Sequence, residues 1–148
     1  MLAIIVLSIA IVVVFYAFTA SMRVFTEELA HSDASFETHK AVDRMTKELR
    51  RSLEIVTANP TDISFWHEDT NNNGSREADE TVEYIWVGSQ EALIRTTYGK
   101  SIIISNSVTR LSLTYDNPSN VRVINISITA QKGESISTLE SSVKPRNL

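Results

Sequence analysis

Residues 69–80 are the segment whose residue types are best suited to chemistry. Their sequence, DTNNNGSREADE, fits the pattern D-x-[DN]-x-[DN]-G-x5-E of calcium-binding loops, with Gly74 at the sharp turn. Calcium binds about six to eight hard oxygen atoms. The oxygens offered here come from Asp69, Asn71, Asn73, the Ser75 carbonyl, Glu77 directly or through water, and a bidentate Glu80. One interpretation of this segment is therefore a calcium site.

A polar hairpin loop is the alternative interpretation of the same segment. Asn and Gly tolerate left-handed backbone conformations, so a plain turn would also select them. The segment lies between expected strands rather than helices, and Arg76 stands where a calcium loop normally turns an apolar side chain inward. Because asparagine replaces aspartate at two ligand positions, a calcium site here would be weak, with a dissociation constant of about 10⁻⁴–10⁻³ M.

The histidines give weaker signals. His67 precedes Glu68 and Asp69, which could indicate a metal or acid–base site, but its spacing from Phe65 is more typical of packing at a sheet edge. His31 and His39 are eight residues apart on the expected stalk, and a metal shared between them is not expected.

No motif in the chain indicates catalysis. The sequence has no cysteine, four glycines, no G-x-S-x-G elbow and no glycine-rich phosphate loop. Its net charge of −4 gives no basic footprint for nucleic acid. Trp66 and Trp86 fit cross-strand packing, with a partner-binding patch as the alternative. We therefore do not expect an enzyme or a nucleic-acid-binding protein.

The N-terminal segment is expected to form the helix to which the rest of the chain is attached. Residues 1–22 carry no charge, Arg23 is the first ionisable side chain, and neither Gly nor Pro occurs before Pro60. At about 1.5 Å per residue, 22 helical residues reach about 33 Å, enough to cross a bilayer core of about 30 Å. A signal peptide ending near residues 17–20 is the alternative, but the charged start that signal peptides need is absent. We expect a retained transmembrane helix over residues 1–22.

An amphipathic helix is expected to continue this rod over residues 23–58. Asn59 precedes Pro60 and is pushed out of the helical region, so the helix should end near Ala58. Apolar residues recur at helical spacing and predict one packed face, densest from Val42 onward. The expected face comprises Phe25, Leu29, Phe36, Val42, Met45, Leu49, Leu53 and Val56.

Over residues 59–148 the apolar side chains recur with a period of two, which predicts a head made of antiparallel strands. Alternating segments occur near residues 63–67, 82–86, 93–98, 111–115 and 124–130, with a short apolar run at 102–104 and a weaker edge strand at 135–143. Turn residues separate them, and the short spacers favour antiparallel neighbours. The expected fold is α+β: a long N-terminal helix packed on a small antiparallel sheet.

This layout resembles type IV pilins and type II secretion pseudopilins. The basic helix end DRMTKELRRS is similar to the stalk end of minor pseudopilins. The segments VEYIW, LIRT, VTRLSLTY and the closing VKPRNL resemble J-type pseudopilins, W-type minor pilins and competence pseudopilins. Prepilins of this kind begin with a basic leader, which is followed by Phe-Thr-Leu-Ile-Glu and then by the apolar run. Residues 1–7 resemble the part that follows this glutamate. We therefore expect a leader and this motif to be encoded upstream of Met1.

The resemblance implies a minor subunit that primes or caps a pilus-like filament in a pilus, secretion or competence system. Implied partners are other pilin or pseudopilin subunits through the N-terminal helix, the inner-membrane assembly platform and membrane lipid. The chain would cross the inner membrane once, with its head outside the cytoplasm. The alternative from another functional class is a membrane-anchored sensor whose head binds calcium or another ligand.

Overall fold

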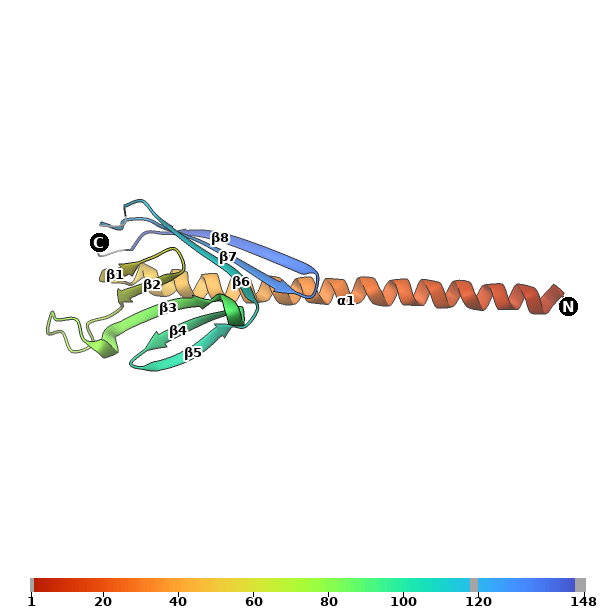
Figure 1. Cartoon of the computed structure of the whole chain (residues 1–148), viewed down its shortest axis with the longest axis horizontal. Helices are drawn as coiled ribbons and strands as arrows, with labels where there is room; N and C mark the ends of the chain where they lie inside the picture. The colour runs from red at the N-terminus through yellow and green to blue at the C-terminus, as the bar shows by residue number, and fades with distance from the viewer. Residues whose placement is uncertain (1, 118–119, 146–148) are drawn as a thin grey trace.

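A computed structural model describes residues 2–117 and 120–145 and shows one long helix that ends inside a β-sheet head (Figure 1). The helix α1 spans Leu2–Arg50, and the head follows it in the chain. The strands are β1 (Glu54–Ala58), β2 (Asp62–Trp66), β3 (Thr81–Val87), β4 (Ala92–Thr97), β5 (Lys100–Ser105), β6 (Val108–Tyr115), β7 (Ile124–Lys132) and β8 (Ser135–Val143). Short 3-10 turns, η1 (Ala78–Glu80) and η2 (Gly88–Gln90), precede β3 and β4. The predicted α+β class is confirmed.

Helix α1 divides into a bare half and a packed half. Every described side chain from Ala3 to Leu29 is exposed. The buried stripe begins further along and consists of Ala34, Thr38, Ala41, Val42, Met45 and Leu49, which recur every three or four residues. The apolar half is long and hydrophobic enough to span a membrane.

The expected helix end at Ala58 is wrong, because α1 ends at Arg50 and residues 54–58 form β1. The last helical turn tightens as Ser52 donates its backbone N–H and its hydroxyl to the Leu49 carbonyl. The Leu53 N–H then bonds to the Trp66 carbonyl at 2.8 Å, which starts the β1–β2 ladder. The β-branched run Ile55–Thr57 favours a strand once a partner strand is available. The stalk therefore covers residues 2–50, and the head begins before residue 59.

The predicted packed face of the helix is only partly correct. Val42, Met45 and Leu49 are buried as expected, whereas Phe25, Leu29, Phe36 and Val56 are exposed. Small residues take over the contact where the head first meets the helix, and the Thr38 hydroxyl lies 3.3 Å from that of Ser137 on β8. Because these side chains are small, the head lies close to the helix backbone there.

The first sheet has five antiparallel strands in the order β1-β2-β3-β4-β5. Its inward face supplies Ile63, Phe65, Val82, Tyr84 and Leu93 to the core. A bulge between Ile55 and Thr57 interrupts the β1–β2 pairing.

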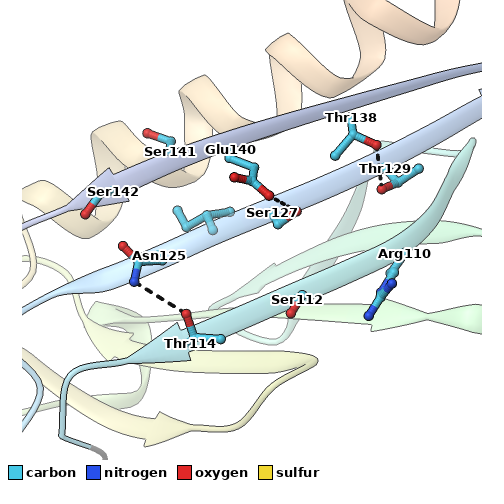
Figure 2. Close-up of a pocket in the computed structure, with 11 residues that line it drawn as sticks. Arg110, Ser112, Thr114, Asn125, Ser127, Thr129, Thr138, Glu140, Ser141 and Ser142 are labelled. Atoms are coloured by element: carbon cyan, nitrogen blue, oxygen red, sulfur yellow. Dashed lines mark hydrogen bonds between the residues drawn. The ribbon is translucent and has the colours of Figure 1, made fainter.

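The second sheet has three antiparallel strands in the order β6-β7-β8. Its apolar face packs with the helix and the first sheet around Leu111, Leu113, Ile124, Ile126 and Ile128. The opposite face carries polar side chains throughout the area drawn in Figure 2. In Figure 1 the β7–β8 hairpin runs back along α1 toward the N-terminus. At its tip the Ser135 hydroxyl donates to the Glu27 carbonyl at 3.3 Å.

Three hydrogen bonds join strand β6 of the second sheet to β3 and to the β1–β2 turn of the first sheet. The Leu113 N–H donates to the Pro60 carbonyl, the Tyr115 hydroxyl to the Asn59 carbonyl, and the Trp86 indole to the Val108 carbonyl. The sheets and the helix therefore enclose one core.

Candidate functional site

The predicted calcium segment connects β2 to β3 at the end of the molecule away from the N-terminus (Figure 1). Asp69 organises the turn, because its Oδ1 accepts the Asn73 N–H at 3.2 Å and its Oδ2 accepts the Gly74 N–H at 2.8 Å. Gly74 has φ of +70°, a left-handed conformation that glycine adopts without strain. The predicted sharp turn at Gly74 is thus confirmed.

The asparagines of this loop brace neighbouring backbone. Asn71 Oδ1 accepts the Asn73 N–H at 3.0 Å, and Asn73 Oδ1 accepts the Ser75 N–H at 2.7 Å. The Asn73 amide also donates to Glu77 Oε1 at 2.9 Å. These are the local side-chain-to-backbone bonds by which Asn stabilises turns.

Glu80 differs from the other predicted ligands in its burial. It is buried, with 4% of its surface exposed. Its Oε1 accepts the Thr70 N–H at 2.7 Å, and its Oε2 accepts the Trp66 indole N–H at 3.1 Å and the Glu77 N–H at 3.4 Å. A bidentate bond to a cation would have to replace these contacts.

The loop therefore has a complete structural explanation as a polar turn that is held by its own hydrogen bonds. Within residues 2–117 and 120–145, no group of three or more His, Asp or Glu side chains is placed to hold a metal ion. Arg76, the residue that departs from the calcium pattern, pairs with Glu54 of β1 at 3.2 Å. The calcium site stays a prediction, and its oxygens already have other partners.

The histidines occupy structural or exposed positions. The His67 ring meets the Phe65 ring edge-on, with centroids 6.1 Å apart, and its Nδ1 is buried without a hydrogen-bond partner. His31 and His39 are exposed on α1. The packing interpretation of His67 accounts for its position beside Phe65.

Each tryptophan is anchored by its indole N–H. Trp86 donates to the Val108 carbonyl at 2.8 Å, and Trp66 donates to Glu80. Both rings are half-buried. This agrees with the packing role predicted for them.

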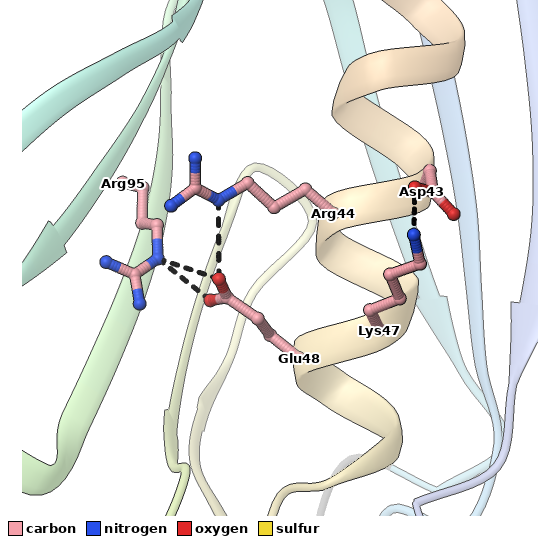
Figure 3. A network of polar contacts seen from close by, with 5 residues as sticks. All are labelled: Asp43, Arg44, Lys47, Glu48 and Arg95. Atoms are coloured by element: carbon pink, nitrogen blue, oxygen red, sulfur yellow. Dashed lines mark hydrogen bonds and ion pairs between the residues drawn. The ribbon is translucent and has the colours of Figure 1, made fainter.

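A charged network, which the sequence did not reveal, joins the head to the stalk (Figure 3). Arg95 Nε on β4 donates to Glu48 Oε1 and Oε2 on α1, at 3.1 and 2.8 Å. Arg44, one helical turn before Glu48, bonds the same carboxylate at 3.3 Å. The side chains of Arg95 and Glu48 are only 13% and 16% exposed. The separate Asp43–Lys47 pair, whose members are four residues apart on the helix, has a distance of 2.6 Å and is exposed.

Tyr84 lies beside this network on the inward face of β3. Burial, and then the negative charge of Glu48, raise the pKa of the Tyr84 hydroxyl well above its usual range. The buried hydroxyl makes no hydrogen bond of regular geometry, although it interacts electrostatically with Glu48.

An apolar stripe on the helix is left uncovered by the described residues. Phe25, Leu29 and Phe36 are 55%, 50% and 65% exposed and lie on one face at spacings of four and seven residues. Phe36 and the buried Met45 are nine residues apart, about two and a half turns, so they point to opposite sides. The stripe therefore continues the apolar half of the helix on the side away from the head.

Comparison with known proteins gives no relative: no protein-family description, no curated protein and no solved structure matches the chain.

Proposed function

We propose that the chain is a minor pilin-like or pseudopilin-like subunit that primes or caps a type IV pilus-like filament. The observation that carries this proposal is the helix itself. It runs from Leu2 to Arg50 as one element, its first half is apolar and bare on all sides, and the head packs only on its second half. Such a rod can lie in a lipid bilayer and later exchange lipid for neighbouring helices without refolding.

The exposed stripe supports a lateral helix partner beyond the bilayer. Phe25, Leu29 and Phe36 follow the charged Arg23 in the chain, so they belong to the polar half of the stalk and yet present apolar surface. Small residues at Ala3, Ser8, Ala10, Ala17 and Ala20 would let neighbouring backbones approach closely in the apolar half. The expected partners are other pilin-like subunits and the inner-membrane assembly platform.

The head in this proposal lies outside the cytoplasm and presents contact surfaces to sister subunits. The hydrogen bonds of the 69–80 loop, of the tryptophans and of the Arg95–Glu48 pair serve a turn, packing and the attachment of the head to the stalk. We therefore propose a subunit of an assembly and not an enzyme.

Disulfide trapping tests this proposal cleanly, because the chain has no cysteine. Leu29→Cys, on the exposed stripe, is compared with Glu91→Cys, an exposed head position in the turn before β4. Each full-length variant is expressed in its own host together with single-cysteine versions of neighbouring pilin-like subunits. Adducts at Leu29→Cys, but not at Glu91→Cys, are expected.

Deletion of the gene gives the second readout. Loss of piliation, secretion or DNA uptake is expected. A purely regulatory phenotype, with no stalk adducts, would contradict the proposal and favour the alternative below.

The alternative is a single-pass membrane protein whose head senses calcium or another ligand. The exposed position of residues 69–77 at the far end of the head favours it, because a ligand could reach this loop freely. Calcium-dependent changes in gene expression, with filament assembly intact after deletion, would distinguish this role.

A further inference from the structure

The outward face of the second sheet forms a regular array of nine polar side chains (Figure 2). Strand pairing sets them in three rows, one side chain from each strand in every row. The rows are Arg110–Thr129–Thr138, Ser112–Ser127–Glu140 and Thr114–Asn125–Ser142. Together with Ile126 and Ser141 they line a hollow of about 780 Å³. We call this surface the polar hollow.

The polar hollow is an open depression in the face of the sheet, and its volume falls within the range of small-molecule sites. Sites for small molecules in proteins commonly enclose about 300–1,000 Å³. Long charged side chains occur at two positions, Arg110 on β6 and Glu140 on β8, and the Glu140 carboxylate reaches Ser127 in the middle row. Apart from Arg110, Glu140 and Asn125, the positions of the array carry serine or threonine. Because these side chains are short, the face is hollowed.

A β-bulge places Arg110 on this face. The register between β6 and β7 shifts between Val108, which pairs with Ala130, and Arg110, which pairs with Thr129. The extra residue, Thr109, allows both Val108 and Leu111 to stay buried while Arg110 points outward. Bulges of this kind commonly re-aim a side chain next to a functional site. The guanidinium of Arg110 makes no ion pair within the described residues, so its planar face is available to a ligand.

The hydroxyls of the polar hollow have bonding capacity to spare. Thr129 and Thr138 are 3.0 Å apart, whereas the Asn125–Thr114 and Ser127–Glu140 contacts are long, at 3.4 Å each. The hydroxyl groups of Ser112 and Ser142 have no hydrogen bond to the part of the protein that the structure describes. A hydroxyl can both donate and accept, so this face can bond a ligand that does the same.

The charge of the hollow selects against ionic ligands. The charges of Arg110 and Glu140 are opposite, so an anionic ligand would be repelled by Glu140 and a cationic ligand by Arg110. An apolar partner would leave the hydroxyls and the amide without water or other partners, at a cost for each unsatisfied group. A neutral ligand that is rich in hydroxyls avoids both penalties, and the methyl groups of Thr114, Thr129 and Thr138 can contact its C–H groups.

We propose that the polar hollow is a binding site for a neutral carbohydrate. Ser112, Ser127 and Ser142 supply hydroxyls to the sugar, Asn125 supplies both a donor and an acceptor, and Arg110 stacks on or bonds to a ring at one end. The site does not depend on the subunit role proposed above, because it uses the face of the head that is turned away from the stalk.

Threonine-methyl NMR on the full chain in lipid nanodiscs tests this site. Nanodiscs replace glycoside detergents, whose sugar headgroups would compete. The probes are maltotriose, cellotriose and triacetylchitotriose, each raised to about 20 mM, which detects a dissociation constant of about 10⁻² M. At least one probe is expected to shift the methyl signals of Thr114, Thr129 and Thr138 while those of Thr96 and Thr97 on β4 stay in place.

Two matched pairs of variants complete the test. Thr129→Val removes a hydroxyl from the hollow, and Thr96→Val makes the same change on the first sheet, where Thr96 pairs with Ser101 at 2.9 Å. Ser127→Lys fills the centre of the hollow, and Ser101→Lys is its control. The hollow variants are expected to weaken binding by about tenfold or more, and the controls by less than about twofold.

Several outcomes would overturn the proposal. They are the absence of any threonine shift with all three probes, equal shifts at Thr96 and Thr97, and unchanged binding by Ser127→Lys. Tighter binding of trigalacturonic acid than of the neutral probes would also overturn it, since the site would then be an anion site.

Discussion

Arg95 on strand β4 donates its Nε–H to both carboxylate oxygens of Glu48 on helix α1, at 3.1 and 2.8 Å (Figure 3). The two residues are 47 positions apart in the chain, and the bond ties the first sheet to the stalk where both side chains are largely shielded from water. Charge-assisted bonds in such surroundings are stronger than exposed ion pairs. The orientation of the head on the helix therefore depends on this contact.

Arg95→Ala is expected to lower the free energy of unfolding by about 1–3 kcal/mol, because Glu48 would lose its best donor while remaining mostly buried. Arg44 still neutralises Glu48, which keeps the loss below that of an isolated buried charge. Lys47→Ala, which breaks the exposed Asp43–Lys47 pair, should cost about 0.5 kcal/mol or less. Urea unfolding of the full chain, followed by tryptophan fluorescence, measures both. Equal effects of the two changes would contradict the central role of Arg95.

The two faces of the stalk should respond oppositely to truncation. Met45→Ala removes a fully buried side chain and should cost about 2–5 kcal/mol of stability. Phe36→Ala, on the exposed stripe, should change stability by about 0.5 kcal/mol or less. Under the proposed function, however, Phe36→Ala should reduce lateral crosslinking at Leu29→Cys. A large stability loss for Phe36→Ala would mean that the stripe already has an intramolecular partner.

Calcium binding by residues 69–80 is expected to be weak, with a dissociation constant of about 10⁻⁴–10⁻³ M. Isothermal titration at several millimolar calcium should show heat, and the melting temperature should rise. Glu77→Ala should reduce both responses, whereas Glu83→Ala, which removes a carboxylate from β3 outside the loop, should not. Absence of heat and of any melting shift would establish the loop as a plain polar turn.

Tyr84 and Tyr115 should differ when their hydroxyls are removed, although burial raises the pKa of both above the usual 10.0. Tyr115→Phe loses a 2.7 Å bond to the Asn59 carbonyl and should cost about 0.5–1.5 kcal/mol at neutral pH. Tyr84→Phe removes a buried hydroxyl without a regular hydrogen bond and should be close to neutral or stabilising.

The pH dependence of these tyrosines follows from the direction of their shifts. Because the pKa of each hydroxyl is higher in the folded state, its ionisation opposes folding: stability does not depend on these groups below pH 10 and falls as the pH rises above it. Ultraviolet titration should show these two side chains ionising only with alkaline unfolding, and each Phe variant should weaken that dependence. Ionisation of Tyr84 in the folded protein near pH 10 would contradict its buried position.

The sequence predicted most of the strands because each has a local signature. The alternation at residues 124–130 identified β7, and turn residues such as Gly99 and Gly133 marked the hairpins, both with positive φ. The end of the helix was missed because Ile55–Thr57 are compatible with either helix or strand by apolar spacing. Only the bond from the Leu53 N–H to Trp66 decides between them, and that bond is a tertiary contact.

The candidate surfaces were harder to predict for a related reason. Phe25, Leu29 and Phe36 obey the helical period as well as Met45 does, and the sequence does not say which face the head will cover. The Arg95–Glu48 bond has no fixed spacing that could reveal it. The hydroxyls of the polar hollow alternate visibly along three strands, but the bulge at Thr109 and the pairing register are needed to bring them into rows.

The unbroken rod has a mechanical consequence. From Met22 to Arg50 it covers 29 residues and rises about 42 Å, and it contains no glycine or proline at which to bend. A change of about 10° in its slope within a bilayer would swing the far end by about 7 Å. Because the β7–β8 hairpin and the Glu48 joint hold the head to the rod at two heights, the head would follow as one body. A change in the thickness of the surrounding bilayer would change the tilt of the helix and would thus displace the head.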